Sequence, residues 1–190
     1  MFRSIGWIEP WTARSAALFA AKAGVLLVAL AVAQSYFVKR YRIAIDTQAT
    51  QCLPGTRIYL VDTYTRDVRR GDVVVFSARG LDKLIEQGHA AAQALAPSYR
   101  DGTKLIKVVA GVSGDRVVVK DDGVTVNGKA VGEGLDLAVT LARPPEAFAR
   151  DEQVPVGMYW VMGETRDSFD SRYWGYVART QVIGRAYGIL

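Results

Sequence analysis

The longest hydrophobic run of the chain lies near its N-terminus. From residue 15 to residue 38 the sequence is almost wholly apolar, and Lys22 is the only charged residue in it. A run of this length can cross the hydrocarbon core of a bilayer as a helix. Lys22 is close enough to one end to extend its ammonium to the headgroups. The pattern predicts an N-terminal segment, residues 1–14, followed by one transmembrane helix over residues 15–38.

A second interpretation of the same run is a cleaved signal peptide. Ala31-Val32-Ala33 before Gln34 has the small-x-small pattern of a cleavage site. The apolar run continues past this site, which favours the membrane helix. Basic residues stand on both sides of the run, so the positive-inside rule does not choose an orientation.

After residue 38 the pattern changes to short strands and tight turns. β-branched and aromatic residues gather in short runs bounded by turn residues, as is typical of strands and hairpins. These runs are 57–62, 71–76, 105–109, 116–119, 120–131, 158–162 and 181–187. The run 120–131 carries two hairpin turn signals, Asp122-Gly123 and Asn127-Gly128. We therefore expect a mainly β, all-β domain over residues 39–190.

One stretch inside this domain has a helical pattern. Apolar side chains between Leu81 and Leu95 recur at helical spacing, and Pro97 ends the pattern. We expect an inserted helix at about 81–97 that packs on the sheet with its apolar face.

Composition narrows the chemistry that the domain can perform. The chain has 190 residues, a net charge of +5, a single cysteine and a single histidine. One cysteine excludes an intramolecular disulfide and a cysteine-based zinc site. No basic block with interleaved aromatic residues occurs, so the sequence favours no nucleic-acid partner. We expect neither a metal nor a cofactor.

A lysine in an apolar strand is the first candidate catalytic group. Lys107 stands inside Leu105-Ile106-Lys107-Val108-Val109, where a charged side chain is unusual. One interpretation is an edge-strand lysine with its ammonium in water. The other is that apolar neighbours favour its neutral form, which can accept a proton. Lys104 is a competitor, but its odd offset from Lys107 predicts that it faces the other side of the strand.

The cysteine is the candidate nucleophile. Cys52 lies in Thr50-Gln51-Cys52-Leu53-Pro54-Gly55, a turn-prone stretch shortly after the predicted membrane helix. A buried structural cysteine is the alternative, since cysteine is among the most buried residues. The polar neighbours and the turn make a poor hydrophobic environment, and reactive groups are often held on such loops.

A third polar feature lies near the C-terminus. Residues 163–175 read Gly-Glu-Thr-Arg-Asp-Ser-Phe-Asp-Ser-Arg-Tyr-Trp-Gly. The acids and arginines of this run can pair with one another, and its glycines permit close backbone approach. We expect a rigid polar corner beside a reactive group.

Three short sequence segments, called boxes below, resemble in their residues and their order the boxes of type I signal peptidases, which are membrane-tethered serine/lysine proteases. The strand box is 70–76, the lysine box is Lys107 to Asp115 and the terminal box is 163–175. The resemblance covers most of the chain from Thr50 onward. It departs from the housekeeping enzymes at the nucleophile, where a thiol replaces the hydroxyl. The single residue between Cys52 and Pro54, the single anchor and the small size are closer to the branch that matures pilins in conjugative transfer.

The resemblance implies a role for each site residue. It makes Cys52 the nucleophile and Lys107 the general base, with Thr50 and the Cys52 backbone N–H as oxyanion donors. Ser168 is then expected to aim the lysine amine. Asp170 and Arg172 are expected to form a structural pair that holds the polar corner.

The implied protein is a membrane-anchored endopeptidase that cleaves a secreted precursor, a conjugative pilin in this branch. It is expected to be a single-pass protein of the bacterial inner membrane, with its catalytic domain on the periplasmic side. We expect a resting thiolate–ammonium pair and a thioester acyl-enzyme. A thioester favours attack by amines, so cyclisation or transpeptidation of the substrate is a further expectation.

Several other interpretations stay open on the sequence. The chain could be a catalytically inactive membrane scaffold that binds pilin or secretion components, or an engineered Ser-to-Cys variant of a serine enzyme. A self-cleaving repressor-type domain shares the serine/lysine chemistry but needs no membrane helix. A Cys52/His89 pair is a further possibility, which the surface-like helix around His89 disfavours.

Overall fold

The computed structural model describes residues 12–48 and 51–189. Contacts divide the chain into two compact units, one that ends at Arg40 and one that begins at Tyr41. The predicted boundary, between residues 38 and 39, lies two positions earlier.

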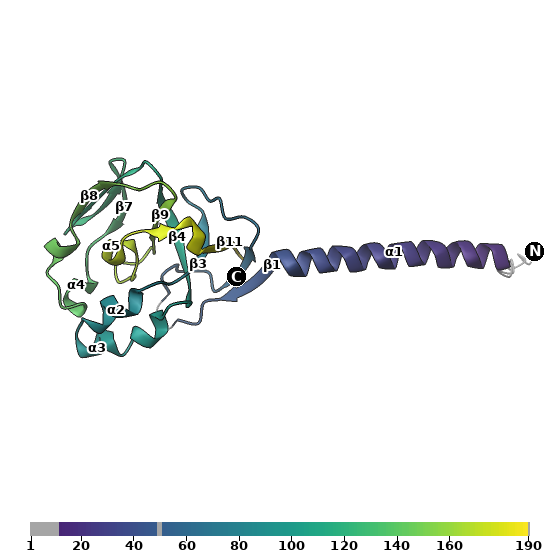
Figure 1. The fold of residues 1–190 in the computed structure, drawn as a ribbon, viewed down its shortest axis with the longest axis horizontal. Coiled ribbons are helices and arrows are strands. Elements are labelled where there is room, and N and C mark those ends of the chain that lie inside the picture. Colours follow the sequence, from purple (N-terminus) through teal and green to yellow (C-terminus); the bar gives the residue numbers. More distant parts are fainter. Residues whose placement is uncertain (1–11, 49–50, 190) are drawn as a thin grey trace, which may run out of the picture. The chain divides into compact units, whose positions relative to one another are not determined.

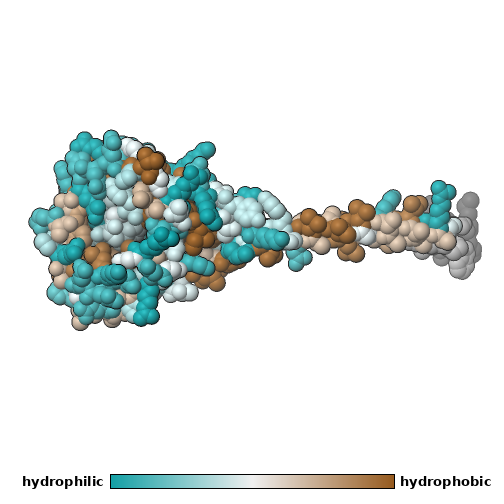
Figure 2. Space-filling model, viewed as in Figure 1, coloured by the Kyte–Doolittle hydropathy of each residue, from teal (hydrophilic) through white to brown (hydrophobic). Residues whose placement is uncertain are grey.

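The first unit is a single long helix, α1 (Ala13–Arg40). Its start is capped by Thr12, whose hydroxyl oxygen accepts a hydrogen bond from the backbone N–H of Ser15 at 3.2 Å. Lys39 and Arg40 stand in its last turn, where cations stabilise the helix dipole. Its surface is largely hydrophobic (Figure 2), with a mean hydropathy of 2.3 in its most apolar part. Length and composition make it able to cross a membrane.

The second unit contains two antiparallel sheets, so the expected mainly β class is confirmed (Figure 1). The larger sheet has the strand order β1-β2-β11-β3-β4-β9-β10. Its strands are β1 (Tyr41–Ile45), β2 (Ile58–Asp62), β3 (Val73–Ser77), β4 (Lys104–Val112), β9 (Met158–Met162), β10 (Val177–Ala178) and β11 (Val182–Gly188). Strand β4 is therefore an interior strand, with β3 on one side and β9 on the other.

The smaller sheet has the order β7-β6-β5-β8. Its strands are β5 (Arg116–Lys120), β6 (Gly123–Val126), β7 (Lys129–Glu133) and β8 (Arg150–Gln153). The predicted turn at Asn127-Gly128 joins β6 to β7, and both residues have positive φ, 51° and 78°. This is the conformation that favours an Asn-Gly pair in a hairpin.

The predicted insertion between β3 and β4 consists of three short helical segments in place of one helix. They are α2 (Leu81–Glu86), α3 (Ala90–Gln93) and the 3-10 turn η1 (Ala96–Tyr99), and α2 lies next to α3 in Figure 1. The helical structure is interrupted between α2 and α3, at Gly88. A Cβ there would lie 2.8 Å from the carbonyl oxygen of Thr140, so tight packing against α4 (Leu137–Thr140) requires glycine.

Some elements were not expected from the sequence. Strand β1 begins directly after α1 and pairs with β2 from Tyr41↔Asp62 to Ile45↔Ile58. Its residues follow directly on the basic residues that end the apolar run, so the sequence pattern did not separate this strand from the end of the membrane segment. Strands β8 and β10 and the short helices η2 (Pro145–Phe148), α5 (Ser171–Trp174) and η3 (Arg179–Gln181) carry little periodic signal of their own. Tertiary pairing decides such short elements.

The hydrophobic core fills the space between the sheets and the inserted helices. Trp160, Phe76 and Phe148 are among its largest fully buried side chains. A second, smaller cluster contains Leu53 and Tyr59 together with Val61, Val75 and Ala186. This second cluster anchors the segment that carries the cysteine.

Candidate active site

Three local features hold Cys52 in place in the loop between β1 and β2. The next residue, Leu53, is buried in the smaller apolar cluster. The turn that follows ends at Gly55, whose φ of +89° suits glycine. The backbone carbonyl of Cys52 accepts a hydrogen bond from the N–H of Glu164 at 2.8 Å. This bond ties the cysteine loop to the polar corner, although the two are far apart in sequence.

The Cys52 thiol is nearly buried, with 9% of the residue exposed. Its Sγ lies 3.7 Å from Oε1 of Gln48. An amide oxygen only accepts hydrogen bonds, so this contact is one that a neutral thiol makes as donor. Thr50, the predicted oxyanion donor, lies outside the described residues.

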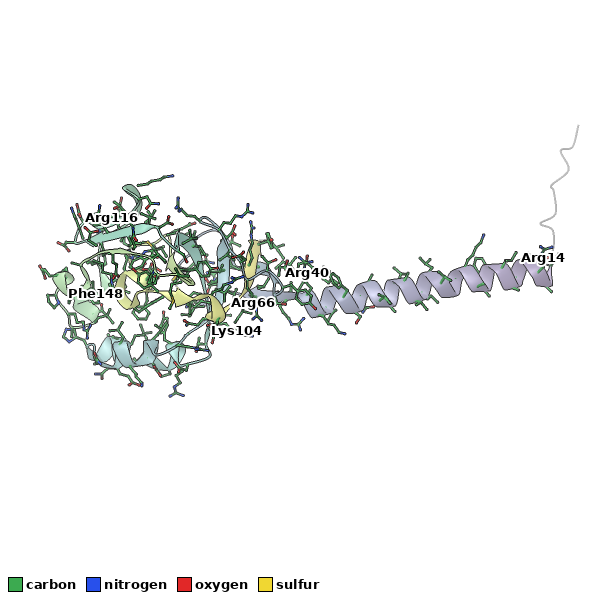
Figure 3. All side chains as sticks on the ribbon, turned by 45° about the horizontal axis from the view of Figure 1, so that its top comes forward. Arg14, Arg40, Arg66, Lys104, Arg116 and Phe148 are labelled. Atoms are coloured by element: carbon green, nitrogen blue, oxygen red, sulfur yellow. The ribbon has the colours of Figure 1, made fainter. Side chains whose placement is uncertain are left out.

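Lys107 occupies the middle of β4, opposite Val74 of β3. Only 4% of the residue is exposed, and its Nζ forms no hydrogen bond or ion pair with any residue that the structure describes. The edge-strand interpretation is wrong, because β4 is an interior strand. Lys104, labelled in Figure 3, stands at the start of the same strand and is exposed.

Cys52 and Lys107 line the same cavity, whose volume is about 480 Å³. Asp46 and Gln48 line it from the segment after β1, and Tyr99 lines it from the insertion. A large cavity with both a thiol and a buried amine in its wall can hold an extended peptide beside the two groups.

Ser168 is packed at the meeting point of the cysteine loop and the end of β9. Val108 of β4 pairs with Met162 of β9, so Lys107 and Gly163 are the next positions along the two strands. A Cβ at Gly163 would overlap the Ser168 side chain and lie 3.0 Å from the carbonyl oxygen of Cys52. Glycine at 163 therefore lets Ser168 and the cysteine loop approach the lysine strand.

The Ser168 hydroxyl is buried and has no hydrogen-bond partner among the described residues. Only 1% of the residue is exposed. A buried hydroxyl without a partner is costly in a fold, so its position needs an explanation.

Asp170 and Arg172 form a fully buried ion pair in the polar corner. Arg172 Nη2 lies 2.8 Å from Oδ2 of Asp170, and Nε donates to Oδ1 at 2.9 Å. The same carboxylate accepts hydrogen bonds from the backbone N–H groups of Gly163 at 3.0 Å and Arg172 at 3.1 Å. Burial opposes the charge of Arg172, but the hydrogen bonds and charge of Asp170 outweigh burial and raise the pKa of Arg172.

The other donors of Arg172 bind backbone carbonyls of two segments. Nη1 donates to Glu133 at 2.7 Å, at the end of β7, and to Arg166 at 3.2 Å. Nη2 donates to Thr165 at 2.9 Å and to Ser168 at 3.3 Å. All three guanidinium nitrogens are engaged, and together they fix the loop that carries Ser168.

Sequence reasoning missed Tyr99, Gln48 and Asp46 as neighbours of Cys52. Tyr99 follows the predicted helix, two residues after Pro97, and the other two stand in a short loop without a motif. Only the tertiary structure brings them to the cavity. Burial is the main cause that raises the pKa of Tyr99 to about 12, and the negative charges of Cys52 and Asp46 add to it.

The Cys52/His89 pair is not supported by the structure. His89 is exposed at the start of α3, and it does not line the cavity that contains Cys52. Within residues 12–48 and 51–189, no group of three or more His, Cys, Asp or Glu side chains is arranged to hold a metal ion.

Known proteins similar to this chain are signal peptidases. The family model described as "Signal peptidase, peptidase S26" matches residues 16–190. Over 123 residues the chain is 35% identical to the Probable signal peptidase I-2 of Synechocystis sp., covering 64% of this chain and 48% of that protein. Over 119 residues it is 34% identical to signal peptidase I of Leptolyngbya laminosa, covering 62% of this chain and 50% of that protein. The chain thus spans about half the length of these two relatives.

A solved structure of a signal peptidase I from Enterococcus faecalis also aligns with the chain. The sequence identity is 24%, and the alignment covers 64% of this chain and 97% of that one with a TM-score of 0.37.

Proposed function

Because the chain belongs to the signal peptidase family, peptidase S26, we propose that it is a membrane-anchored endopeptidase that cleaves a secreted precursor through Cys52 and Lys107. The family expected from the three sequence boxes is confirmed. One observation carries the proposed mechanism: Cys52 and a buried, unpartnered Lys107 line one cavity. A scaffold would have no need for an amine at this position, where its burial costs free energy.

The proposed reaction begins with proton transfer from the Cys52 thiol to the amine of Lys107. The thiolate attacks the scissile carbonyl carbon, and the carbonyl electron pair moves to oxygen. When the tetrahedral intermediate collapses, the C–N bond breaks and the leaving amine takes the proton from the Lys107 ammonium. The acyl group is then held on Cys52 as a thioester. A water molecule then gives a proton to Lys107 and attacks the acyl carbon. The C–S bond breaks, the carboxylic product leaves, and the Lys107 ammonium returns the proton to the Cys52 thiolate.

The supporting residues have distinct tasks in this scheme. The unpartnered Ser168 hydroxyl is available to accept a hydrogen bond from the Lys107 amine and so to orient it. The Cys52 backbone N–H and the Thr50 hydroxyl are proposed as donors to the oxyanion. Asp170 and Arg172 position Ser168 through the backbone contacts of Arg172.

The proposed substrate is a secreted precursor, and more narrowly a conjugative pilin. The support for the pilin is the short spacing from Cys52 to Pro54. We place the protein in the bacterial inner membrane, with α1 as its single span and the unit from Tyr41 onward on the periplasmic side. The length and hydropathy of α1 support the span.

A second candidate activity is transpeptidation, which the cysteine favours. A thioester reacts with amines more readily, relative to water, than an oxygen ester does. An amine of the substrate would attack the acyl carbon, its proton would pass to Lys107, and the C–S bond would break to return the thiolate. The product would be a cyclised or joined subunit.

Co-expression with a candidate pilin precursor tests both activities. We expect wild type to release a shortened product, Cys52→Ala and Lys107→Met to leave the precursor intact, and Cys52→Ser to separate the two outcomes. A cyclic product is one water lighter than the linear one, so intact mass decides between them. Uncut precursor with wild type, in cells where all variants are folded, would favour the scaffold interpretation. Faster cleavage by Cys52→Ser would favour an engineered cysteine.

A further inference from the structure

The inserted segment supplies part of the active-site wall. Its 3-10 turn η1 ends at Tyr99, which lines the cavity that holds Cys52 and Lys107. The insertion stands between the strand box and the lysine box and belongs to neither. It nevertheless contributes Tyr99 to the wall of the cavity that we propose as the active site.

Packing against the polar corner fixes the Tyr99 ring. The ring makes an edge contact with Phe169, with centroids 5.1 Å apart and an interplanar angle of 80°. Phe169 is itself buried and stacks on Tyr173 at 6.0 Å. Phe169 also follows Ser168 directly in sequence, so one loop holds both the Ser168 hydroxyl and the Tyr99 ring. The Tyr99 hydroxyl has no hydrogen-bond partner among the described residues.

The environment of Tyr99 keeps its proton in place. The charged groups that share its cavity are Asp46, Lys104 and Lys107, together with Cys52 when it is ionised. Burial first, and then the negative charges of Cys52 and Asp46, raise the pKa of Tyr99 to about 12. The hydroxyl therefore keeps its proton near neutral pH, where it can donate a hydrogen bond, and it does not compete with Lys107 as a base.

We propose that the Tyr99 hydroxyl is a catalytic hydrogen-bond donor, which stabilises the Cys52 thiolate and then the oxyanion that forms on the scissile carbonyl. The inference rests on the proposed function. The negative charge appears in a nearly buried site, where a fixed donor is worth more than it is in water. The insertion would then take part directly in catalysis, in addition to packing on the sheet.

Alkylation of Cys52 by iodoacetamide across a pH series tests this role without any substrate. Tyr99→Phe removes only the hydroxyl and keeps the ring contact with Phe169. We expect the pH midpoint of alkylation to rise by about one pH unit, which corresponds to a tenfold smaller thiolate fraction. With a cleavable precursor, we expect kcat to fall by about tenfold or more while KM changes little.

Tyr176→Phe is the matched control. Tyr176 is also half-buried, and its pKa is likewise raised to about 12, mainly by burial. It packs against Trp160 at 5.5 Å and does not line the cavity. We expect this variant to keep the wild-type alkylation midpoint and kcat.

Two outcomes distinguish the failure of this inference from that of the proposed function. If wild type cleaves precursors and Tyr99→Phe matches it in both alkylation and kcat, the ring is only a wall and the inference is wrong. If the alkylation midpoint shifts but no precursor is cleaved, the donor role at the thiolate stands and the proposed function fails. Thermal unfolding checks that both variants are folded.

Discussion

Two buried polar clusters meet at the loop 163–175, and they differ in how well their groups are paired. In the polar corner, all three guanidinium nitrogens of Arg172 donate, and both oxygens of Asp170 accept. Near the cavity that Cys52 and Lys107 line, the buried Ser168 Oγ has no hydrogen-bond partner among the described residues, and none of those residues forms a hydrogen bond or ion pair with the Lys107 amine. The two clusters are comparably buried, since Arg172 is 1% exposed and Lys107 is 4% exposed.

We propose that the difference separates structural polar groups from catalytic ones. A saturated buried network repays its desolvation within the fold and fixes a loop in one conformation. Unsaturated buried groups cost stability, and we attribute that cost at Ser168 to its place beside the proposed active site. The corner therefore supports the cavity: Arg172 binds the carbonyl of Ser168, and the corner loop binds the carbonyl of Cys52 through Glu164.

Replacing Lys107 by methionine should have the largest effect on activity. Methionine keeps the apolar stem and removes the base, so we expect precursor cleavage to fall by about 10⁴-fold or more. The free energy of unfolding should stay the same or rise, because an unpaired buried amine is lost. Cleavage assays and urea unfolding measure the two quantities. Lys120→Met, at the end of β5, is the control and should change neither quantity. If Lys107→Met cleaved the precursor at the wild-type rate, Lys107 would not be the general base.

Replacing Arg172 by methionine should have the largest effect on stability. It leaves the Asp170 carboxylate buried without its partner and removes donors from several carbonyls, so we expect a loss of about 3–5 kcal/mol in the free energy of unfolding. Urea denaturation measures it. Arg116→Met breaks an exposed ion pair with Asp151 and should shift the midpoint only slightly. Equal effects of the two substitutions would contradict a structural role specific to the corner.

Two neighbouring serines provide the sharpest test of the comparison. Ser168→Ala removes an unpaired hydroxyl, so we expect cleavage to fall by about 10²-fold with stability unchanged or slightly raised. The Ser171 hydroxyl oxygen accepts a hydrogen bond from the N–H of Val161 at 2.9 Å. Ser171→Ala should therefore cost about 1–3 kcal/mol of stability by leaving that N–H unpaired. The comparison fails if Ser168→Ala destabilises the fold as much as Ser171→Ala.

The smallest effect is expected at Asp115, where a second saturated carboxylate closes the lysine box. Burial opposes its charge, but hydrogen bonds from Arg70, the Val112 N–H and Asn127 outweigh burial and hold its pKa below the ordinary 3.8. Its stabilising contribution is therefore complete above about pH 4 and is lost as the pH falls through the lower folded-state pKa.

Asp115→Asn checks this contribution. The substitution should lower the free energy of unfolding by about 1–2 kcal/mol at pH 7 and make it less dependent on pH below 4. Urea unfolding at several pH values measures both. If the free energy of unfolding of Asp115→Asn fell with pH as steeply as that of wild type, carboxylates other than Asp115 would cause the loss of stability in acid.

The local sequence pattern predicted most of the strands, because strand and turn formation depend strongly on the residues of the segment itself. Alternating β-branched residues and the Asn127-Gly128 turn specify strands and a hairpin wherever they stand. The sequence predicted a single helix over the insertion, but the structure interrupts it at Gly88. Gly88 packs against the backbone carbonyl of Thr140, a residue far away in the sequence, so local pattern could not predict the interruption. Strand β1 was missed, because its partner β2 defines it.

The sequence alone indicated the nucleophile, the lysine and the polar corner, since each is unusual within its own segment. It also specified the apolar helix, because length and hydropathy are properties of a continuous run. Tertiary structure alone decided that Cys52 and Lys107 line one cavity, that β4 is an interior strand and that Tyr99 joins the site. The physical reason is that pairing and burial arise between segments far apart in the chain, and strand register and loop contacts set them only when the protein folds.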